Sequence, residues 1–127
     1  MIIYRPVDIE EEIRAQLADH FTVYVRPLPA NFAVPSLLIT ATGGTSKNTI
    51  DNFTVVIDAR ANTPAAADEL ARNALGALER IAKEQKGALR YLSINALANW
   101  RTDPVRPELS MRTITAQVKA HREKVTI

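Results

Sequence analysis

Apolar and polar side chains alternate strictly near the end of the chain, and this alternation constrains the fold most. The apolar positions of residues 113–120 are Ile114, Ala116, Val118 and Ala120. Because successive side chains of a strand point to opposite faces of a sheet, the pattern predicts a strand with one buried and one wet face. A second segment, residues 50–60, repeats the pattern with Phe53, Val55, Ile57 and Ala59 on its apolar face. The two segments predict a mostly antiparallel sheet that is covered on one side.

Three further segments predict additional strands of this sheet. They are residues 21–25, 36–42 and about 89–98. The polar residues 43–49 follow the second of these, and we expect them to form the loop of an antiparallel hairpin. Residues 26–35 contain the prolines Pro27, Pro29 and Pro35, so this segment predicts an extended loop.

Two amphipathic segments predict helices. Asp8 and Glu11 have the spacing of a capping box at the start of the first helix, which should end near His20. Thr63 is the predicted N-cap of a second, longer helix, and Gly87 suits its exit. The element order is then α-β-β-β-α-β-β. We predict a single α+β domain over residues 1–127, with a mostly antiparallel sheet of four to five strands and two helices packed on one face.

The composition excludes several kinds of chemistry. The chain contains no cysteine, which rules out disulfides, thiolate nucleophiles and Cys-based metal sites. Its two histidines, His20 and His121, have no carboxylate partners at a fixed spacing, and residues 43–47 lack the spacing of a phosphate-binding loop. We therefore predict no catalytic residue, no metal site, no cofactor and no enzyme activity. The absence of a long apolar run or a signal-peptide pattern predicts a soluble intracellular protein that does not bind membranes.

The net charge of +2 is distributed unevenly along the chain. Residues 1–85 carry 8 Lys/Arg and 11 Asp/Glu, whereas residues 86–127 carry 8 Lys/Arg and 3 Asp/Glu. The basic end either attracts phosphates or acidic proteins, or forms a solvated strand face that prevents aggregation. Its last predicted strand has no aromatic residue on which bases could stack, so sequence-specific nucleic-acid binding is not predicted. A weak attraction to passing DNA remains open.

The order of these features resembles the tail terminator, or tail-to-head joining, proteins of long-tailed bacteriophages. The resemblance covers most of the chain and is carried by residues 8–17 (DIEEEIRAQL), 27–40 (PLPANFAVPSLLIT), the pair Gly43-Gly44, residues 51–78 and residues 103–122. It implies a structural virion protein with helices on a mostly antiparallel sheet. Such proteins form a homo-oligomeric ring, typically a hexamer, on the head-proximal end of the tail tube. The ring ends polymerisation of the tube and contacts the head connector, and DNA passes through its lumen.

Two polar segments are the predicted assembly interface. The residues are Thr45, Ser46, Lys47 and Asn48 in the first, and Arg101, Asp103, Arg106 and Arg112 in the second. Pro104 and Pro107 stiffen the second segment, which lowers the entropy that it loses on binding. Three alternatives stay open: the second loop only crosses the sheet edge, the chain is another neck or tail-completion protein, or it is a small nucleic-acid or protein-binding module that uses its basic final strand.

Overall fold

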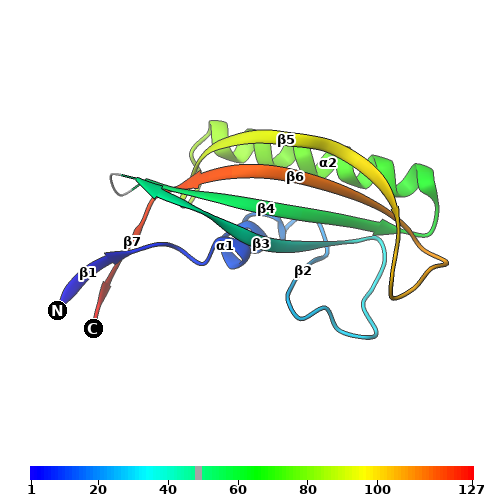
Figure 1. The fold of residues 1–127 in the computed structure, drawn as a ribbon, viewed down its shortest axis with the longest axis horizontal. Coiled ribbons are helices and arrows are strands. Elements are labelled where there is room, and N and C mark those ends of the chain that lie inside the picture. Colours follow the sequence, from blue (N-terminus) through cyan, green and yellow to red (C-terminus); the bar gives the residue numbers. More distant parts are fainter. Residues whose placement is uncertain (48–49) are drawn as a thin grey trace.

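A computed structural model describes residues 1–47 and 50–127 of the chain (Figure 1). Its helices are α1 (Ile9–Leu17) and α2 (Pro64–Lys83). Its strands are β1 (Ile2–Arg5), β2 (Val23–Val25), β3 (Ser36–Lys47), β4 (Ile50–Ala61), β5 (Leu89–Thr102), β6 (Ser110–Ala120) and β7 (Glu123–Thr126). The predicted α+β class and the mostly antiparallel sheet are confirmed.

The main sheet is built around a long antiparallel pair, β4 and β6. Its strand order is β2-β3-β4-β6-β5, and only the short β2 runs parallel to its neighbour β3. The register of β4 with β6 runs from Asp51 opposite Ala120 to Ala61 opposite Ser110. These two pairs mark the two ends of the sheet, at the left and the right of Figure 1.

Both helices cover the same face of the sheet, and their starting residues explain where they begin. Asp8 Oδ1 accepts a hydrogen bond from the backbone N–H of Glu11 at 3.2 Å, and Thr63 Oγ1 accepts one from Ala66 at 3.1 Å. Each cap satisfies a backbone donor that the first turn of a helix leaves free. The helices bury the apolar face predicted from the alternation, including Ile57, Ile114 and Val118.

The strands are longer than the sequence predicted at two places. Residues 43–47, expected to be loop, continue β3 and pair with β4 up to Lys47 opposite Ile50. Likewise β5 extends to Thr102, so that Arg101 belongs to a strand and the loop beside it begins at Asp103. Backbone pairing with a neighbouring strand stabilises polar residues in a strand as well as apolar ones, because the ladder hydrogen bonds do not involve side chains.

A second, two-stranded sheet was not predicted. In it β1 pairs antiparallel with β7, from Ile2 opposite Thr126 to Arg5 opposite Glu123. This terminal ribbon projects from the body of the domain, with the N- and C-termini side by side (Figure 1). Each strand has only four residues, too few for a clear alternation signal.

Candidate assembly surfaces

The predicted interface residues lie at the two opposite ends of the main sheet. Thr45, Ser46 and Lys47 belong to the β3–β4 end. Arg101 on β5 and Arg112 on β6 lie at the other end, where Arg101 is paired with Met111 and Arg112 with Trp100. Asn48 falls outside the described residues. The structure therefore separates the two segments into two different surfaces.

The hairpin end of the sheet is held by a cluster around Arg122. The guanidinium of Arg122 donates to both carboxylate oxygens of Asp51 and to Ser46 Oγ, each at 3.0 Å. These hydrogen bonds from Arg122 hold the pKa of the buried Asp51 below its usual value. Ser46 is thus engaged within its own subunit, and the neighbouring exposed residues Thr45 and Lys47 remain available for contacts.

The backbones of β3 and β4 also approach each other closely in this hairpin. A Cβ atom built on Gly44 would lie 2.2 Å from the backbone oxygen of Asn52 on the opposite strand. Only glycine fits that spacing without a shift of the backbone. Gly44 therefore serves the packing of the hairpin strands, where the sequence suggested a polar loop.

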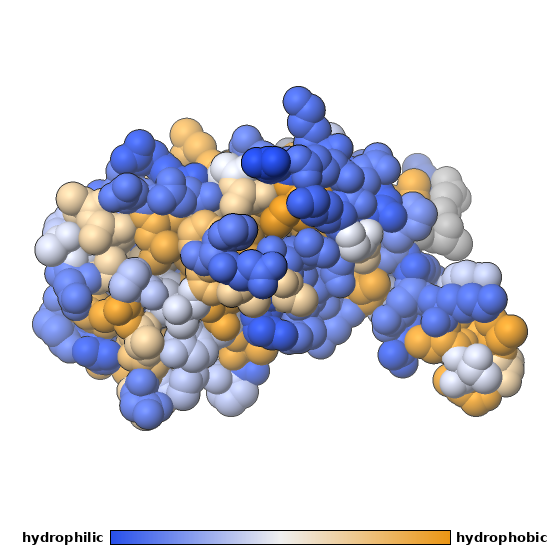
Figure 2. All heavy atoms as spheres, turned by 180° about the vertical axis from the view of Figure 1, so that it is seen from behind, coloured by the Kyte–Doolittle hydropathy of each residue, from blue (hydrophilic) through white to orange (hydrophobic). Residues whose placement is uncertain are grey.

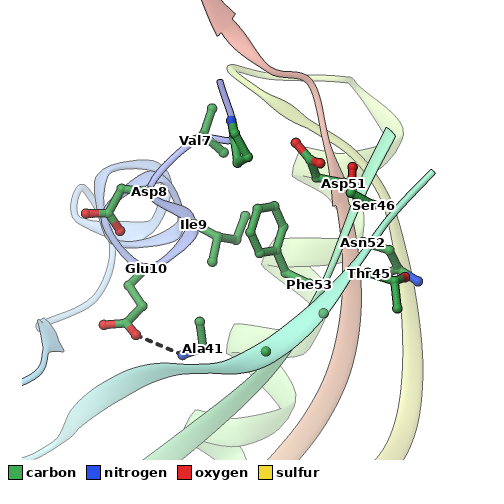
Figure 3. Close-up of a pocket in the computed structure, with 13 residues that line it drawn as sticks. Val7, Asp8, Ile9, Glu10, Ala41, Thr45, Ser46, Asp51, Asn52 and Phe53 are labelled. Atoms are coloured by element: carbon green, nitrogen blue, oxygen red, sulfur yellow. Dashed lines mark hydrogen bonds between the residues drawn. The ribbon is translucent and has the colours of Figure 1, made fainter. Parts of the chain in front are cut away.

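An apolar recess of about 470 Å³ lies between the start of α1 and the base of the hairpin (Figure 3). Ile9 and Phe53 form its centre. Burial raises the pKa of Glu10 at its edge, but hydrogen bonds from Arg26 at 2.6 Å and from the backbone N–H of Ala41 at 2.9 Å outweigh it, and the pKa is lowered. Glu10 thus ties α1 to β3 as an ionised carboxylate, which is a structural role.

The opposite end of the sheet is organised by a buried ion pair. Arg60 Nε lies 2.8 Å from Asp103 Oδ2, and the two residues are 5% and 0% exposed. The other oxygen of Asp103 accepts a hydrogen bond from the backbone N–H of Val105 at 2.9 Å. Burial raises the pKa of Asp103, but the hydrogen bonds from Val105 and Arg60 outweigh it and hold the pKa below its usual value.

This geometry changes the role of one predicted residue, Asp103. Asp103 is enclosed by its own subunit, where it anchors the loop of residues 103–109 to β4, so it offers no side-chain surface to a partner. Asp58, two residues before Arg60 on β4, accepts a hydrogen bond from Thr113 Oγ1 on β6 at 2.8 Å. Which side chains meet across a sheet depends on the register of the paired strands, so spacing along one strand does not predict the partner.

A buried aromatic ring joins this loop to the proline-rich segment. Phe32, which is 3% exposed, lies 5.6 Å from the guanidinium carbon of Arg60 and 5.1 Å from that of Arg106. Such cation–π contacts stabilise by roughly 0.5–2 kcal/mol each. Arg106 also pairs with Glu108 at 3.1 Å. No role was predicted for Phe32, although an aromatic residue among prolines indicates a loop that packs against the rest of the fold.

The remaining predicted residues differ in exposure. Arg101 is exposed at the end of β5. Arg112 is half-buried, and its buried Nε makes no hydrogen bond to any described residue. In the second predicted segment, Arg101 is therefore fully accessible to a partner protein. Arg106 and Arg112 are partly accessible.

Within residues 1–47 and 50–127 no cluster of three or more His, Asp or Glu side chains is arranged to hold a metal ion. None of the helices in this described part is long and apolar enough to cross a membrane. No protein-family model and no curated protein sequence matches the chain.

Proposed function

We propose that the chain is a structural protein of a long-tailed bacteriophage that forms a six-membered ring on the head-proximal end of the tail tube. The ring ends polymerisation of the tube and joins it to the head connector, and DNA passes through the lumen. The subunits act by binding and carry out no catalysis.

The observation that carries this proposal is that the two ends of the sheet differ, although each is held by side-chain contacts within the subunit. A closed ring that caps a tube needs unlike surfaces on each subunit, because one surface meets the tube or the connector and another meets the neighbouring subunit. One end of this sheet is a polar hairpin held by Arg122 and Asp51. The other is a loop held by a buried ion pair, with exposed Arg101 beside it. Both surfaces are ordered within the subunit, so little conformational entropy is lost when they bind.

Termination also needs a subunit that binds the tube without copying its surface. A tube subunit exposes a surface that templates the next ring, and a cap must cover it while presenting a different one. In the proposed arrangement Thr45 and Lys47, at the hairpin end, contact the tube or the connector. Arg101 and the partly exposed Arg106 contact the neighbouring subunit.

Negative-stain electron microscopy across a concentration series tests the proposal. We expect six-fold rings with a central hole wide enough for duplex DNA. Tubes polymerised in the presence of the protein should carry a ring at one end. Monomers at every concentration, together with bare tube ends, would contradict the proposed function.

Two charge reversals separate ring formation from tube binding. Arg101→Glu should abolish or weaken ring formation, because it reverses an exposed charge of the subunit contact. Lys47→Glu should leave rings intact but reduce their attachment to tubes. The matched control is Arg72→Glu on α2, a helix that contributes to neither surface, where the wild-type side chain is 71% exposed. Equal behaviour of all three variants would contradict the assigned roles.

A further inference from the structure

A pocket of about 730 Å³ lies where β6 leaves the main sheet and the chain continues into β7. Its cations are Arg90, Lys119 and Arg122, and no Asp or Glu occurs among the described residues that line it. We call it the basic pocket. Ligand sites in proteins typically measure about 300–1,000 Å³. The basic pocket is therefore large enough for a small ligand or for part of a longer one, and its charge favours an anion.

The terminal ribbon stands beside this pocket but does not supply its charge. Figure 2 shows the ribbon as an arm separate from the main body, with apolar residues at its tip. The ribbon contributes Tyr4, which is 63% exposed. The three cations belong to the main sheet and to the two residues that follow β6. The charge of the pocket thus does not depend on where the ribbon lies.

Arg122 is held in place within the subunit and still has unused donors. Its Nε and Nη2 donate to Asp51 and Ser46. Its Nη1 makes no hydrogen bond to a described residue, and the side chain is 26% exposed. The carboxylate of Asp51 offsets the charge of Arg122 but does not occupy this nitrogen. An anion can therefore accept a hydrogen bond from Nη1 without displacing Asp51.

Arg90 is also oriented by its own subunit. Its Nη1 donates to the backbone carbonyl oxygens of Gln85, Gly87 and Leu89 at 2.6–3.2 Å. In the described part of the chain, its Nε and Nη2 have no hydrogen-bond acceptor and the guanidinium has no carboxylate partner. Because the guanidinium is already fixed, little side-chain entropy is lost when an anion binds its remaining donors.

Tyr91 and Lys119 bring an aromatic ring and a cation together across two strands. They are directly opposite in the register of β5 and β6, and Lys119 Nζ lies 5.3 Å from the centre of the Tyr91 ring. Both side chains are exposed, that of Tyr91 to 55%. The strand β6 has no aromatic residue of its own, so strand pairing supplies a ring that the sequence of β6 lacks.

Cations beside exposed aromatic rings are the combination by which proteins bind single-stranded nucleic acids. The cations contact phosphates, and the rings stack on bases whatever their sequence. We propose that the basic pocket binds a single strand of nucleic acid without regard to sequence. Arg90, Lys119 and Arg122 contact its phosphates, and Tyr91 and Tyr4 stack on its bases. This site goes beyond the proposed function and does not depend on the ring.

A duplex and an acidic protein would each use only part of this arrangement. The bases of a duplex are stacked on one another, so a duplex would engage the cations and not the tyrosine rings. An acidic peptide supplies carboxylates for the cations but no bases for stacking. Only a single strand uses both kinds of side chain, so dependence on Tyr91 distinguishes it from the other two ligands.

Fluorescence anisotropy of a labelled single strand of about ten thymidines tests the site, since single-strand sites span about 4–16 nucleotides. Three phosphate contacts predict that log K falls with log salt concentration with a slope of about −2. Lys119→Ala removes one contact, so it should weaken binding at low salt and change the slope to about −1.4. Lys83→Ala is the matched control, because Lys83 is an exposed lysine on α2 outside the basic pocket, and it should change neither quantity.

Substitutions of Tyr91 test stacking separately from charge. Tyr91→Ser removes the ring and should weaken binding roughly 10-fold. Tyr91→Phe keeps the ring and should bind the strand as the wild type does. The slope with salt should stay near −2 in both variants, because the number of phosphate contacts is unchanged.

Four results would overturn the site. The first is no binding of the strand at low salt. The second is an equal effect of Lys119→Ala and Lys83→Ala, which would indicate attraction to the overall charge. The third is equal affinity for a duplex of the same length, or unchanged binding by Tyr91→Ser, which would exclude stacking. The fourth is equally effective competition by poly-glutamate, which would assign the pocket to an acidic protein.

The outcomes also separate this site from the proposed function. Rings in electron micrographs without binding of the strand would overturn the site and leave the function standing. Binding that depends on Lys119 and Tyr91, in a protein that forms no rings alone or on tubes, would retain the site and overturn the function.

Discussion

Arg60 and Asp103 place opposite charges in the interior at one end of the sheet. Removing one partner of such a pair leaves an unpaired buried charge, which costs about 3–5 kcal/mol. We expect Asp103→Ala to lower the free energy of unfolding by roughly that amount, as measured by denaturant titration. Asp68→Ala removes the carboxylate of an exposed Arg72–Asp68 pair at 3.0 Å, and it should change the free energy of unfolding by less than about 1 kcal/mol. Equal effects of the two substitutions would contradict the structural role of Asp103.

The same residue predicts how stability depends on pH. The folded-state pKa of Asp103 is lower than its usual value, because the hydrogen bonds from Val105 and Arg60 outweigh burial. Its stabilising contribution is therefore complete above the unfolded-state pKa of about 3.9 and is lost as pH falls toward the folded-state pKa. We expect the stability difference between wild type and Asp103→Asn to be constant above about pH 5 and to shrink below about pH 4. A difference that stays constant to about pH 2 would contradict this.

At the scale of elements, Gly44 and Gly76 should respond in opposite ways to substitution by alanine. A Cβ on Gly44 would meet the backbone of β4 at 2.2 Å, whereas a Cβ on Gly76 in α2 would meet nothing within 4 Å. Gly44→Ala should destabilise the protein by on the order of 1–3 kcal/mol, because the hairpin strands must move apart. Gly76→Ala should stabilise it by about 0.5–1 kcal/mol, because alanine has less conformational freedom to lose in a helix. Thermal unfolding of both variants checks the signs, and a stabilising Gly44→Ala would contradict the close approach.

At the scale of the whole molecule, the domain consists of a covered sheet and a ribbon that packs little against it. The core consists of side chains from α1, α2 and the inner face of β3, β4, β5 and β6, and it includes no residue of the described β1 or β7. In dilute protein the ribbon amides should exchange with solvent much faster than those of β4 and β6, because local opening of the ribbon exposes little apolar surface. Hydrogen exchange of the dilute protein measured by mass spectrometry checks this, and strong protection of the ribbon amides would contradict it.

The sequence by itself determined the class of the fold and the starts of its helices. Alternation at 50–60 and 113–120 identified the two central strands and their buried faces, and the side chains of Asp8 and Thr63 identified the helix starts. These features depend on the period of side chains along one segment or on contacts three residues apart. Such local features can be predicted from one segment of the sequence without knowing which other segments it contacts.

Only the tertiary structure decided which distant residues meet. Asp103 finds Arg60 across 43 positions, Arg122 finds Asp51 across 71, and the chain ends pair across 126. The same pairing turned residues 43–47 from an expected loop into strand and enclosed a residue that was expected at the surface. Partners of this kind are selected by sheet register and by the cost of burying an unpaired charge, and both act only once separate segments are brought together.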